Sequence, residues 1–421
     1  MYRKSVLKNG LRVVSHEIKE RDSVSVGIWC GTGGRFESDE IKGAAHFLEH
    51  ILFKGSRKYS CDEIKMQIEG VGGSLNAFTS EEQTCYLAKV PALHVSKTFD
   101  VLADMVFCPR ISHEDVEKER GVILEEIKMY HDLPQYFVVE ELERLMWPDH
   151  PLGKGLAGTA DSVSQLTDQK LKDFHTTQYI PNNIVLSACG NISHQALVDL
   201  ARKKTSAFGP GTFRPAEPFH SSGEGDRMIF HHRPIEQMHL ALGMPGMDHF
   251  DPGRYALNLL NVVVGGNMSS RLFDEVREKR GLAYSIYSSA KSLADTGLFV
   301  IRAGVENTRI TQTLEVVLQE LDKICRDGIT PSEFKRAKKY LTGQLLLGLE
   351  DTMEHMLWIG ESTMIRDRIR TLDEVMEAIK KVRIDDVRKA AQRVFQPQEM
   401  RLAVVGPIKP EQERQIRSLM G

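Results

Sequence analysis

The sequence contains an internal repeat. The repeated unit is a helical pattern, then a proline, then a short apolar strand that ends in glycine, and it occurs twice. The segment YIPNNIVLSACGNI in the first half parallels FQPQEMRLAVVGPI in the second. Pro181 matches Pro397 and Gly190 matches Gly406, both 216 residues apart. The same spacing pairs VSVGIWCG near the N-terminus with LALGMPG. Self-similarity at one fixed spacing predicts two homologous halves.

The boundary between the halves is predicted at residues 209–226, a stretch rich in Gly, Pro and Ser with little apolar periodicity. Such composition is typical of an exposed linker. The sequence therefore predicts one half over residues 1–208 and a second over 227–421. A length of 421 residues is compatible with two or three domains.

The fold class is predicted to be α+β. Strand-like alternation in LRVVSHEI, SVSVGIW and QTCYLAKV coexists with helical patterns over residues 95–106, 112–130 and 310–327. We expect each half to place helices against a largely antiparallel sheet. Two linked halves of this kind favour a clamshell around an internal space.

Composition argues against a nucleic-acid or membrane partner. The formal net charge is −3 with both signs well mixed, so the chain offers no strong field to polyanions. The N-terminus has no secretory pattern, and the longest apolar runs are too short to span a bilayer. The six cysteines form no C-x-x-C pair, which favours reduced thiols. These features predict a cytoplasmic protein.

The segment GAAHFLEHILFKGS contains the motif H-x-x-E-H. On a helix, His46 and His50 leave the same face one turn apart, which suits two imidazole ligands on one zinc. Glu49 lies beside that face, within reach of a water on the metal. The alternative is a pair of hydrogen-bonded core histidines, but an apolar helix bears these polar groups at a cost unless they are satisfied. The pattern is that of the inverted zinc-peptidase motif.

A third ligand is expected from the helix predicted over 112–130, because catalytic zinc takes three protein ligands and one water. This helix carries Glu114, Glu117, Glu119, Glu125 and Glu126. Glu119 and Glu126 are two turns apart and share one side. Spacing lets Glu126 bind the metal with Glu119 behind it, and it does not exclude Glu125.

The chemistry expected of such a site is peptide hydrolysis. Zinc lowers the pKa of a bound water and polarises the scissile carbonyl, and Glu49 is the predicted general acid and base. Two imidazoles and one carboxylate favour zinc, although manganese or cobalt would also fit.

Beyond these patterns, the sequence resembles the pitrilysin/insulinase family of inverted-motif zinc peptidases. The resemblance rests on HFLEH with FKGS, GGSLNAFTSEEQTCY, ERGVILEEIKMYHDLP and SSRLFDEVREKRGLAYSIYSS, and so covers essentially the whole chain. It is strongest to the short bacterial members, which are similar to the mitochondrial processing peptidase β subunit. The resemblance implies Glu126 as the third ligand, Glu119 as its helper, and one zinc per chain.

The resemblance also implies how substrate is held. In the family, an edge strand at LNAF pairs with the substrate backbone, and Asn76, Ala77 and Phe78 are the matching positions. In the second half, Tyr284 would donate to the developing oxyanion. Arg277 would hold substrate or the loop of that tyrosine.

The second half has no metal motif of its own, since ALNLLNVVVGG offers neither histidine nor carboxylate. The resemblance accordingly implies a catalytic half and an inactive half that closes over substrate, with helices on one face of each sheet and a homodimer in solution. The expected function is an endopeptidase acting on peptides or unfolded segments. The alternatives are a catalytically dead structural subunit and a peptide-binding module without turnover; the complete set of expected site residues argues against the first.

Overall fold

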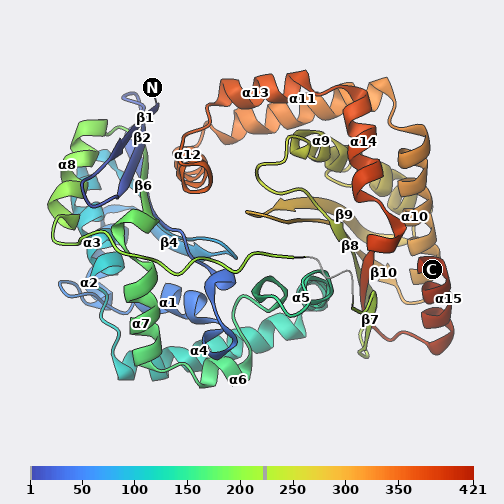
Figure 1. Ribbon diagram of the computed structural model, residues 1–421, viewed down its shortest axis with the longest axis horizontal. Helices are drawn as coiled ribbons and strands as arrows, with labels where there is room; N and C mark the ends of the chain where they lie inside the picture. Colours follow the sequence, from blue (N-terminus) through green and yellow to red (C-terminus); the bar gives the residue numbers. More distant parts are fainter. Residues whose placement is uncertain (1, 221–224) are drawn as a thin grey trace. The chain divides into compact units, whose positions relative to one another are not determined.

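The computed structural model describes residues 2–220 and 225–421 of the chain. These residues form two compact units, each assembled from three separate stretches (Figure 1). Unit 1 comprises Met1–Ile127, Gly155–Glu217 and Leu346–Leu372, and unit 2 comprises Lys128–Lys154, Pro218–Leu345 and Asp373–Gly421. None of the described helices is both long and apolar enough to cross a membrane.

Unit 1 is built on a six-stranded sheet with the order β1-β2-β6-β3-β5-β4. Its strands are β1 (Tyr2–Val6), β2 (Arg12–Glu17), β3 (Ser23–Cys30), β4 (Ser74–Thr79), β5 (Thr84–Pro91) and β6 (Ile184–Gly190). Every neighbouring pair is antiparallel except β2 and β6. Among the described strands, β4 pairs with β5 alone and is therefore an edge strand.

Unit 2 is built on a five-stranded sheet with the order β7-β11-β8-β10-β9. Its strands are β7 (Met228–His232), β8 (Gln237–Pro245), β9 (Ala283–Ser292), β10 (Gly297–Glu306) and β11 (Arg401–Gly406). Only β7 and β11 are parallel. Apart from β1, this order repeats that of the first sheet, with β9 in the place of β4. The predicted α+β fold with largely antiparallel sheets is confirmed.

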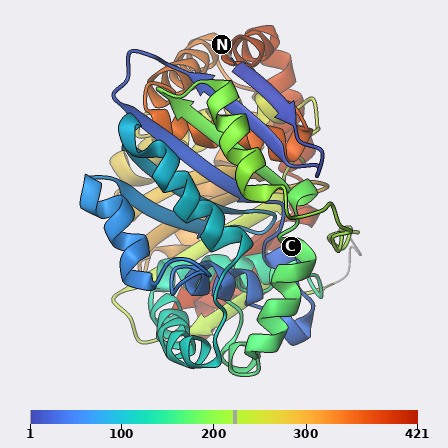
Figure 2. The same ribbon diagram turned by 90° about the vertical axis from the view of Figure 1, so that its left-hand side faces the viewer.

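The first half contains both helices predicted from periodicity, over residues 95–106 and 112–130, together with further helices. All its helices are α1 (Ala44–Leu52), α2 (Cys61–Ile68), α3 (Val95–Phe107), α4 (His113–Asp132), α5 (Pro134–Met146), α6 (Ala160–Ser164), α7 (Asp168–Gln178) and α8 (His194–Thr205). α3 and α8 cover one face of the first sheet (Figure 2). α4 begins where the sequence predicts, because the Ser112 hydroxyl accepts a hydrogen bond from the Asp115 backbone N–H at 3.1 Å.

The helices of the second half are α9 (Arg254–Val264), α10 (Ile310–Asp327), α11 (Pro331–Gly348), α12 (Thr352–Arg366), α13 (Leu372–Lys381), α14 (Ile384–Val394) and α15 (Pro410–Met420). The bounds of α10 are those predicted from periodicity. The spacing of 216 residues also relates α7 to α14 and α8 to α15, so the repeat extends to the helices that flank the strands.

The expectation of helices on one face of each sheet is incomplete, because one further helix covers the opposite face of each sheet, and this helix comes from the other half of the sequence. Val13 and Val14 alternate on β2; Val13 belongs to the core under α3 and α8, whereas Val14 packs with Met356 and Ile359 of α12. In unit 2, α5 packs in the same way on β8 and β11. The compact units thus differ from the sequence halves 1–208 and 227–421 by these two helices.

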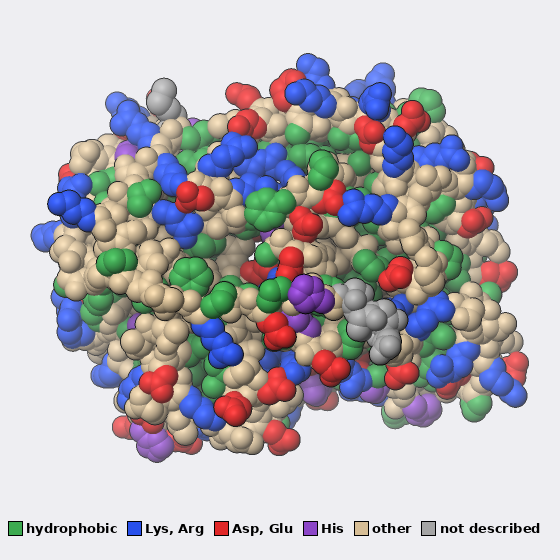
Figure 3. Space-filling view, viewed as in Figure 1, with side chains coloured by type: hydrophobic (Ala, Val, Ile, Leu, Met, Phe, Trp, Pro, Cys, Tyr) green, Lys and Arg blue, Asp and Glu red, His purple; other side chains and the backbone are tan. Residues whose placement is uncertain are grey.

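Charged side chains of both signs are interspersed over the face of the molecule shown in Figure 3. This distribution agrees with the mixed charge of the sequence, which contains 55 Lys and Arg residues and 58 Asp and Glu residues.

Candidate metal centre

Helix α1 presents three polar side chains from an otherwise apolar surface. Its buried residues, all fully inaccessible, are Ala44, Ala45, Phe47, Leu48, Ile51 and Leu52. These residues anchor the helix in the core of unit 1, next to β4 and α7 (Figure 1). His46, Glu49 and His50 occupy the remaining, half-buried face. The motif is therefore on a helix, as expected.

His46, His50 and Glu126 converge in unit 1, although Glu126 comes from α4. One ligand atom from each residue lies within 4.8 Å of the other two. The Nε2 atoms of His46 and His50 are 3.8 and 3.4 Å from the two carboxylate oxygens of Glu126. No other group of three or more such residues occurs in the described parts of the chain.

These three side chains fit a zinc ion. Tetrahedral zinc with bonds of about 2.0–2.2 Å holds its ligand atoms about 3.4 Å apart. The two distances to Glu126, 3.4 and 3.8 Å, are close to this value, whereas the group as a whole, whose ligand atoms lie within 4.8 Å of one another, would contract on binding the ion. Burial, with a smaller effect of His50, lowers the pKa of His46 to about 4, so this imidazole is in the neutral form that a metal needs. The chemistry and spacing of the donors thus agree with the expected site.

Glu119 contacts His50 on the side of the ring away from Glu126, and Lys54 contacts Glu119. Nδ1 of His50 donates to a carboxylate oxygen of Glu119 at 2.9 Å, and the Lys54 ammonium lies 2.5 Å from the other oxygen. Burial opposes a charge on His50, but hydrogen bonds to Glu119 and Glu126 outweigh it and raise the pKa of His50 to about 9. The carboxylates of Glu119 and Glu126 therefore favour a positive charge on or next to the His50 ring. A histidine ligand oriented by a carboxylate is the usual arrangement in zinc sites.

Glu125 points elsewhere. Its side chain is exposed on α4 and is not part of the cluster, whereas Glu126 is half-buried. Glu119 is buried, with 4% exposure. Of the two glutamates that spacing left open, Glu126 is the one that lies in the group with the two histidines.

Glu49 lies on the same helix face, and Thr79 at the end of β4 donates to its carboxylate at 2.6 Å. Burial raises the pKa of Glu49, while the hydrogen bond from Thr79 opposes this effect. A carboxylate with a raised pKa beside a candidate metal site is suited to the role of a general base.

The predicted substrate strand is β4, an exposed edge as expected. The amide oxygen of Asn76 accepts a hydrogen bond from the Ala77 N–H at 2.9 Å. The Phe78 ring is 36% exposed and meets Trp29 edge to face at 5.6 Å. These residues lie on the strand that ends at Thr79, next to Glu49.

Arg277 and Tyr284 lie in unit 2, each at an irregularity of the backbone. Arg277 belongs to a π-helical turn, Phe273–Glu278, and its guanidinium is 5.8 Å from the centre of the Tyr284 ring. Tyr284 is the extra residue of a β-bulge, since Gly304 pairs with Ser285 and Val305 with Ala283. Its side chain is 74% exposed. Both irregularities recur at functional sites.

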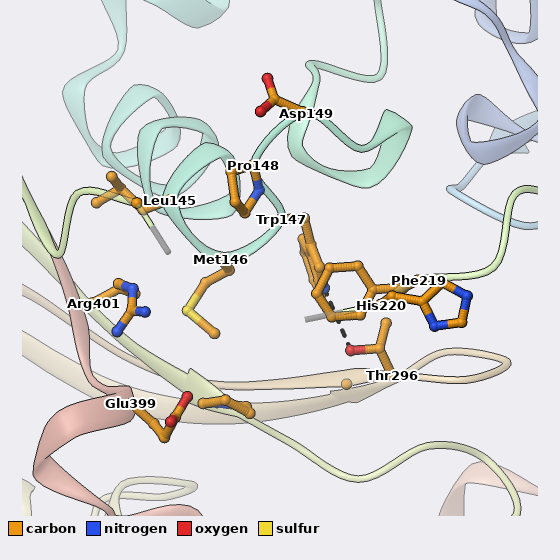
Figure 4. Close-up of a pocket in the computed structure, with 13 residues that line it drawn as sticks. Leu145, Met146, Trp147, Pro148, Asp149, Phe219, His220, Thr296, Glu399 and Arg401 are labelled. Atoms are coloured by element: carbon orange, nitrogen blue, oxygen red, sulfur yellow. Dashed lines mark hydrogen bonds between the residues drawn. The ribbon is translucent and has the colours of Figure 1, made fainter. Parts of the chain in front are cut away.

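A cavity of about 460 Å³ lies elsewhere in unit 2, beyond the end of α5 (Figure 4). Trp147, Phe219 and Arg401 contribute to its wall, and the Trp147 indole donates to the Thr296 hydroxyl at 3.4 Å. None of the predicted site residues lines this cavity.

The sequence analysis did not identify Thr79 and Lys54, nor Glu37 and Lys42, which contact the N-terminal end of α1. Thr79 and Lys54 stand inside the segments SLNAFTS and LFKGS, close to recognised positions. Their partners Glu49 and Glu119 are distant in sequence, so spacing carried no signal for either contact.

Comparison with known protein families gives two matches that together span most of the chain. Residues 12–160 match the family described as insulinase, peptidase family M16. Residues 165–341 match the domain described as the peptidase M16 inactive domain.

Relatives of known name extend over nearly the whole sequence. A protein named as a zinc protease in Streptomyces coelicolor is 39% identical over 97% of this chain and 90% of its own length. YmxG of Bacillus subtilis, also named as a zinc protease, is 36% identical over 97% of this chain and 98% of its own.

Solved structures share the fold. A protease from Helicobacter pylori superimposes with a TM-score of 0.91 at 22% identity, covering 97% of this chain and 100% of the other. A Pseudomonas fluorescens protein described as a peptidase M16 inactive domain superimposes with a TM-score of 0.90 at 21% identity, covering 97% and 99%.

Proposed function

This chain belongs to the insulinase family of peptidases, family M16, and from that membership we propose that it is a zinc endopeptidase acting on peptides or unfolded segments. One observation carries the proposal: His46, His50 and Glu126 converge within 4.8 Å on one face of α1. We assign them as the ligands of one zinc per chain.

A bound zinc would supply Lewis-acid polarisation of the scissile carbonyl and a lowered pKa for the attacking water. Glu49 accepts the proton of that water and returns it to the leaving amine. Thr79 holds the Glu49 carboxylate through its hydrogen bond. Glu119 fixes the orientation of His50 through Nδ1.

β4 holds the substrate in this proposal. An extended peptide adds to the free edge of β4 beside Asn76, Ala77 and Phe78, and main-chain hydrogen bonds supply most of the affinity. Because such bonds ignore side-chain identity, specificity is expected to be broad. The exposed edge and its junction with Glu49 through Thr79 support this role.

The second half completes the site. Residues 1–208 form the catalytic half, 209–226 the linker, and 227–421 the inactive half that encloses substrate. Tyr284 donates to the oxyanion, and Arg277 holds substrate or the tyrosine. The neighbouring π-turn and bulge support a functional placement of these two residues. We also expect a homodimer, which the mass of the chain in solution would reveal.

The test is cleavage of a quenched-fluorescence peptide library by the wild type and by Glu49→Gln. Loss of the proton acceptor lowers kcat by about 10²–10⁴-fold, while zinc binding persists because no ligand is removed. Glu125→Gln, an exposed change on α4, serves as the matched control and retains activity.

Two results would oppose the proposal. Zinc-loaded wild type that cleaves no member of the library would favour a non-catalytic structural or peptide-binding protein. Equal activity of Glu49→Gln and the wild type would remove Glu49 from the mechanism.

A further inference from the structure

The N-terminus of the metal-binding helix lacks the usual cap. The residue before α1 is Gly43, which has φ of +94° and no side chain to accept a hydrogen bond from the first turn. Capping side chains at this position normally satisfy one of the free N–H groups of a helix. A side chain at Gly43 is also excluded, since a Cβ there would lie 2.7 Å from the carbonyl oxygen of Ala157.

Glu37 replaces the missing cap from outside the helix. Its two carboxylate oxygens accept hydrogen bonds from the backbone N–H groups of Gly43 and Ala45 at 3.0 and 2.6 Å. The Glu37 residue is only 2% exposed. A buried carboxylate at a helix N-terminus also interacts favourably with the helix dipole.

Lys42 compensates the charge of this buried carboxylate. Its ammonium lies 3.2 Å from Glu37 and donates to the carbonyl of Gly34 at 2.9 Å. Lys42 itself is only 4% exposed. Removing one partner of a buried ion pair is costly, so the pair holds the segment before α1 in one arrangement.

The two histidine ligands differ in how they are held. Nδ1 of His50 donates to Glu119. Nδ1 of His46 is buried and has no hydrogen-bond partner among the residues that the structure describes. Because outer hydrogen bonds usually orient metal-binding histidines, the position of His46 depends instead on the backbone that carries it.

That backbone is the turn that Glu37 caps. α1 has nine residues, His46 is the third of them, and its neighbour Ala45 donates directly to Glu37. His50 lies one turn farther along. Fraying of the first turn would therefore displace His46 and leave His50 in place.

We propose that Glu37, paired with Lys42, is a positioning residue that fixes His46 for metal binding. The proposal rests on the zinc site assigned above and adds to it a residue 9 positions before the ligand in sequence. Glu37 touches neither metal nor substrate and acts only through the first turn of α1.

The experiment compares Glu37→Gln with Ser60→Ala, measuring zinc affinity against a chromogenic chelator and the unfolding free energy of the zinc-free protein. A glutamine accepts through one oxygen only, and its NH₂ group then faces the second backbone N–H. Ser60 caps α2 in the same unit through a capping box, and α2 carries no ligand. Both variants are expected to lose stability.

Only Glu37→Gln is expected to lose zinc affinity, by about 10–100-fold, the range typical of outer-shell partners. The visible spectrum of bound Co²⁺ is expected to change in the same variant and not in Ser60→Ala. Zinc affinity equal to that of the wild type, with lowered stability, would reduce Glu37 to a structural cap and overturn the proposal.

Glu37→Asp covers the case in which Glu37→Gln fails to fold. It retains the charge but shortens the side chain by one methylene, so weaker zinc binding than in Ser60→Ala is again expected, and equal binding contradicts the proposal. A wild type that binds no zinc would instead refute the proposed function itself.

Discussion

In the candidate metal centre, His50, Glu49 and Glu119 each hydrogen-bond to a partner on another segment of the chain, whereas Nδ1 of His46 has no hydrogen-bond partner among the described residues. Glu119 orients His50, Thr79 orients Glu49, and Lys54 balances the charge of Glu119. Such outer contacts fix the direction of the reacting groups and tune their basicity. The centre therefore depends on residues of α4 and β4 as much as on α1.

The assignment of Glu126 predicts a difference between two neighbouring glutamates. Glu126→Gln removes a ligand and is expected to weaken zinc binding by more than about 100-fold, beyond the range for outer-shell partners. Glu125→Gln changes an exposed side chain and is expected to leave the affinity unchanged. Competition against a chromogenic chelator measures both, and equal affinities of the two variants would refute the assignment.

A histidine remote from the metal predicts how stability depends on pH. His175 on α7 donates to the carbonyl of Val106 at 2.8 Å and stacks on Tyr179. Burial lowers its pKa to about 4, so the unfolded chain takes up a proton more readily than the folded one. Stability contributed by the neutral ring is present above the unfolded pKa of about 6.5 and is lost as pH falls through about 4.

The loss of unfolding free energy attributable to His175 is about 1–2 kcal/mol. The side chain is half-buried, and solvent screening therefore reduces the contribution of its shifted pKa to stability. Urea unfolding of the zinc-free protein between pH 7 and pH 4 measures it. His175→Gln is expected to flatten the acid side of the curve. An identical pH dependence in this variant would show that other groups carry the effect.

α12 approaches the first sheet closely because a glycine faces it. A Cβ at Gly360 would lie 2.1 Å from Nε1 of Trp29 and 2.8 Å from the hydroxyl of Ser187, two groups joined by a hydrogen bond. Only a residue without a side chain allows this separation between helix and strands.

Gly360→Ala is accordingly expected to destabilise the protein by about 1–3 kcal/mol through overpacking. Gly121→Ala on α4 is the control, because no atom of the described residues outside its own stretch of helix backbone lies within 4 Å of its Cβ position. There, alanine is expected to stabilise the helix by up to about 1 kcal/mol. Denaturant unfolding measures both changes, and equal effects would contradict the close contact.

Sequence periodicity predicted several regular elements and failed at irregular ones. The periodicity of 310–327 gives the bounds of α10, because one apolar stripe packs on one surface. The π-turn at Arg277 and the bulge at Tyr284 each insert a residue into a regular element. Whether the inserted residue is tolerated depends on tertiary contacts, so the spacing of apolar residues in the sequence does not predict it. Likewise, Met356 and Ile359 mark an apolar face of α12 without indicating which sheet it covers.

The candidate site was predictable to the extent that its residues share one helix. His46, Glu49 and His50 follow from spacing on α1. Glu126 required the resemblance, since spacing also allowed Glu125. Glu37 and Thr79 act through contacts with other segments of the chain, and the spacing of residues in one sequence does not predict such contacts.

The exchange of α5 and α12 ties the two halves of the sequence into one molecule. Residues 1–208 lack α12, which covers Val14, Trp29 and Val185 of the first sheet. Residues 227–421 lack α5, which covers part of the second sheet. Each half alone would expose a large apolar face, and such faces favour aggregation.

Cutting the chain within the linker tests this interdependence. Residues 1–208 expressed alone are expected to aggregate or unfold, whereas co-expression with residues 209–421 is expected to yield a stable complex. Size-exclusion chromatography and circular dichroism distinguish these states. A fragment of residues 1–208 with the stability of the intact chain would show that α12 is dispensable.

The most direct measurement of the zinc site is an anomalous difference map from crystals of the zinc-loaded protein, with data collected on both sides of the zinc absorption edge. We expect one zinc peak per chain, bonded to His46, His50 and Glu126 at about 2.0–2.2 Å. A peak bonded to other residues, or no peak at these three side chains, would contradict the assignment.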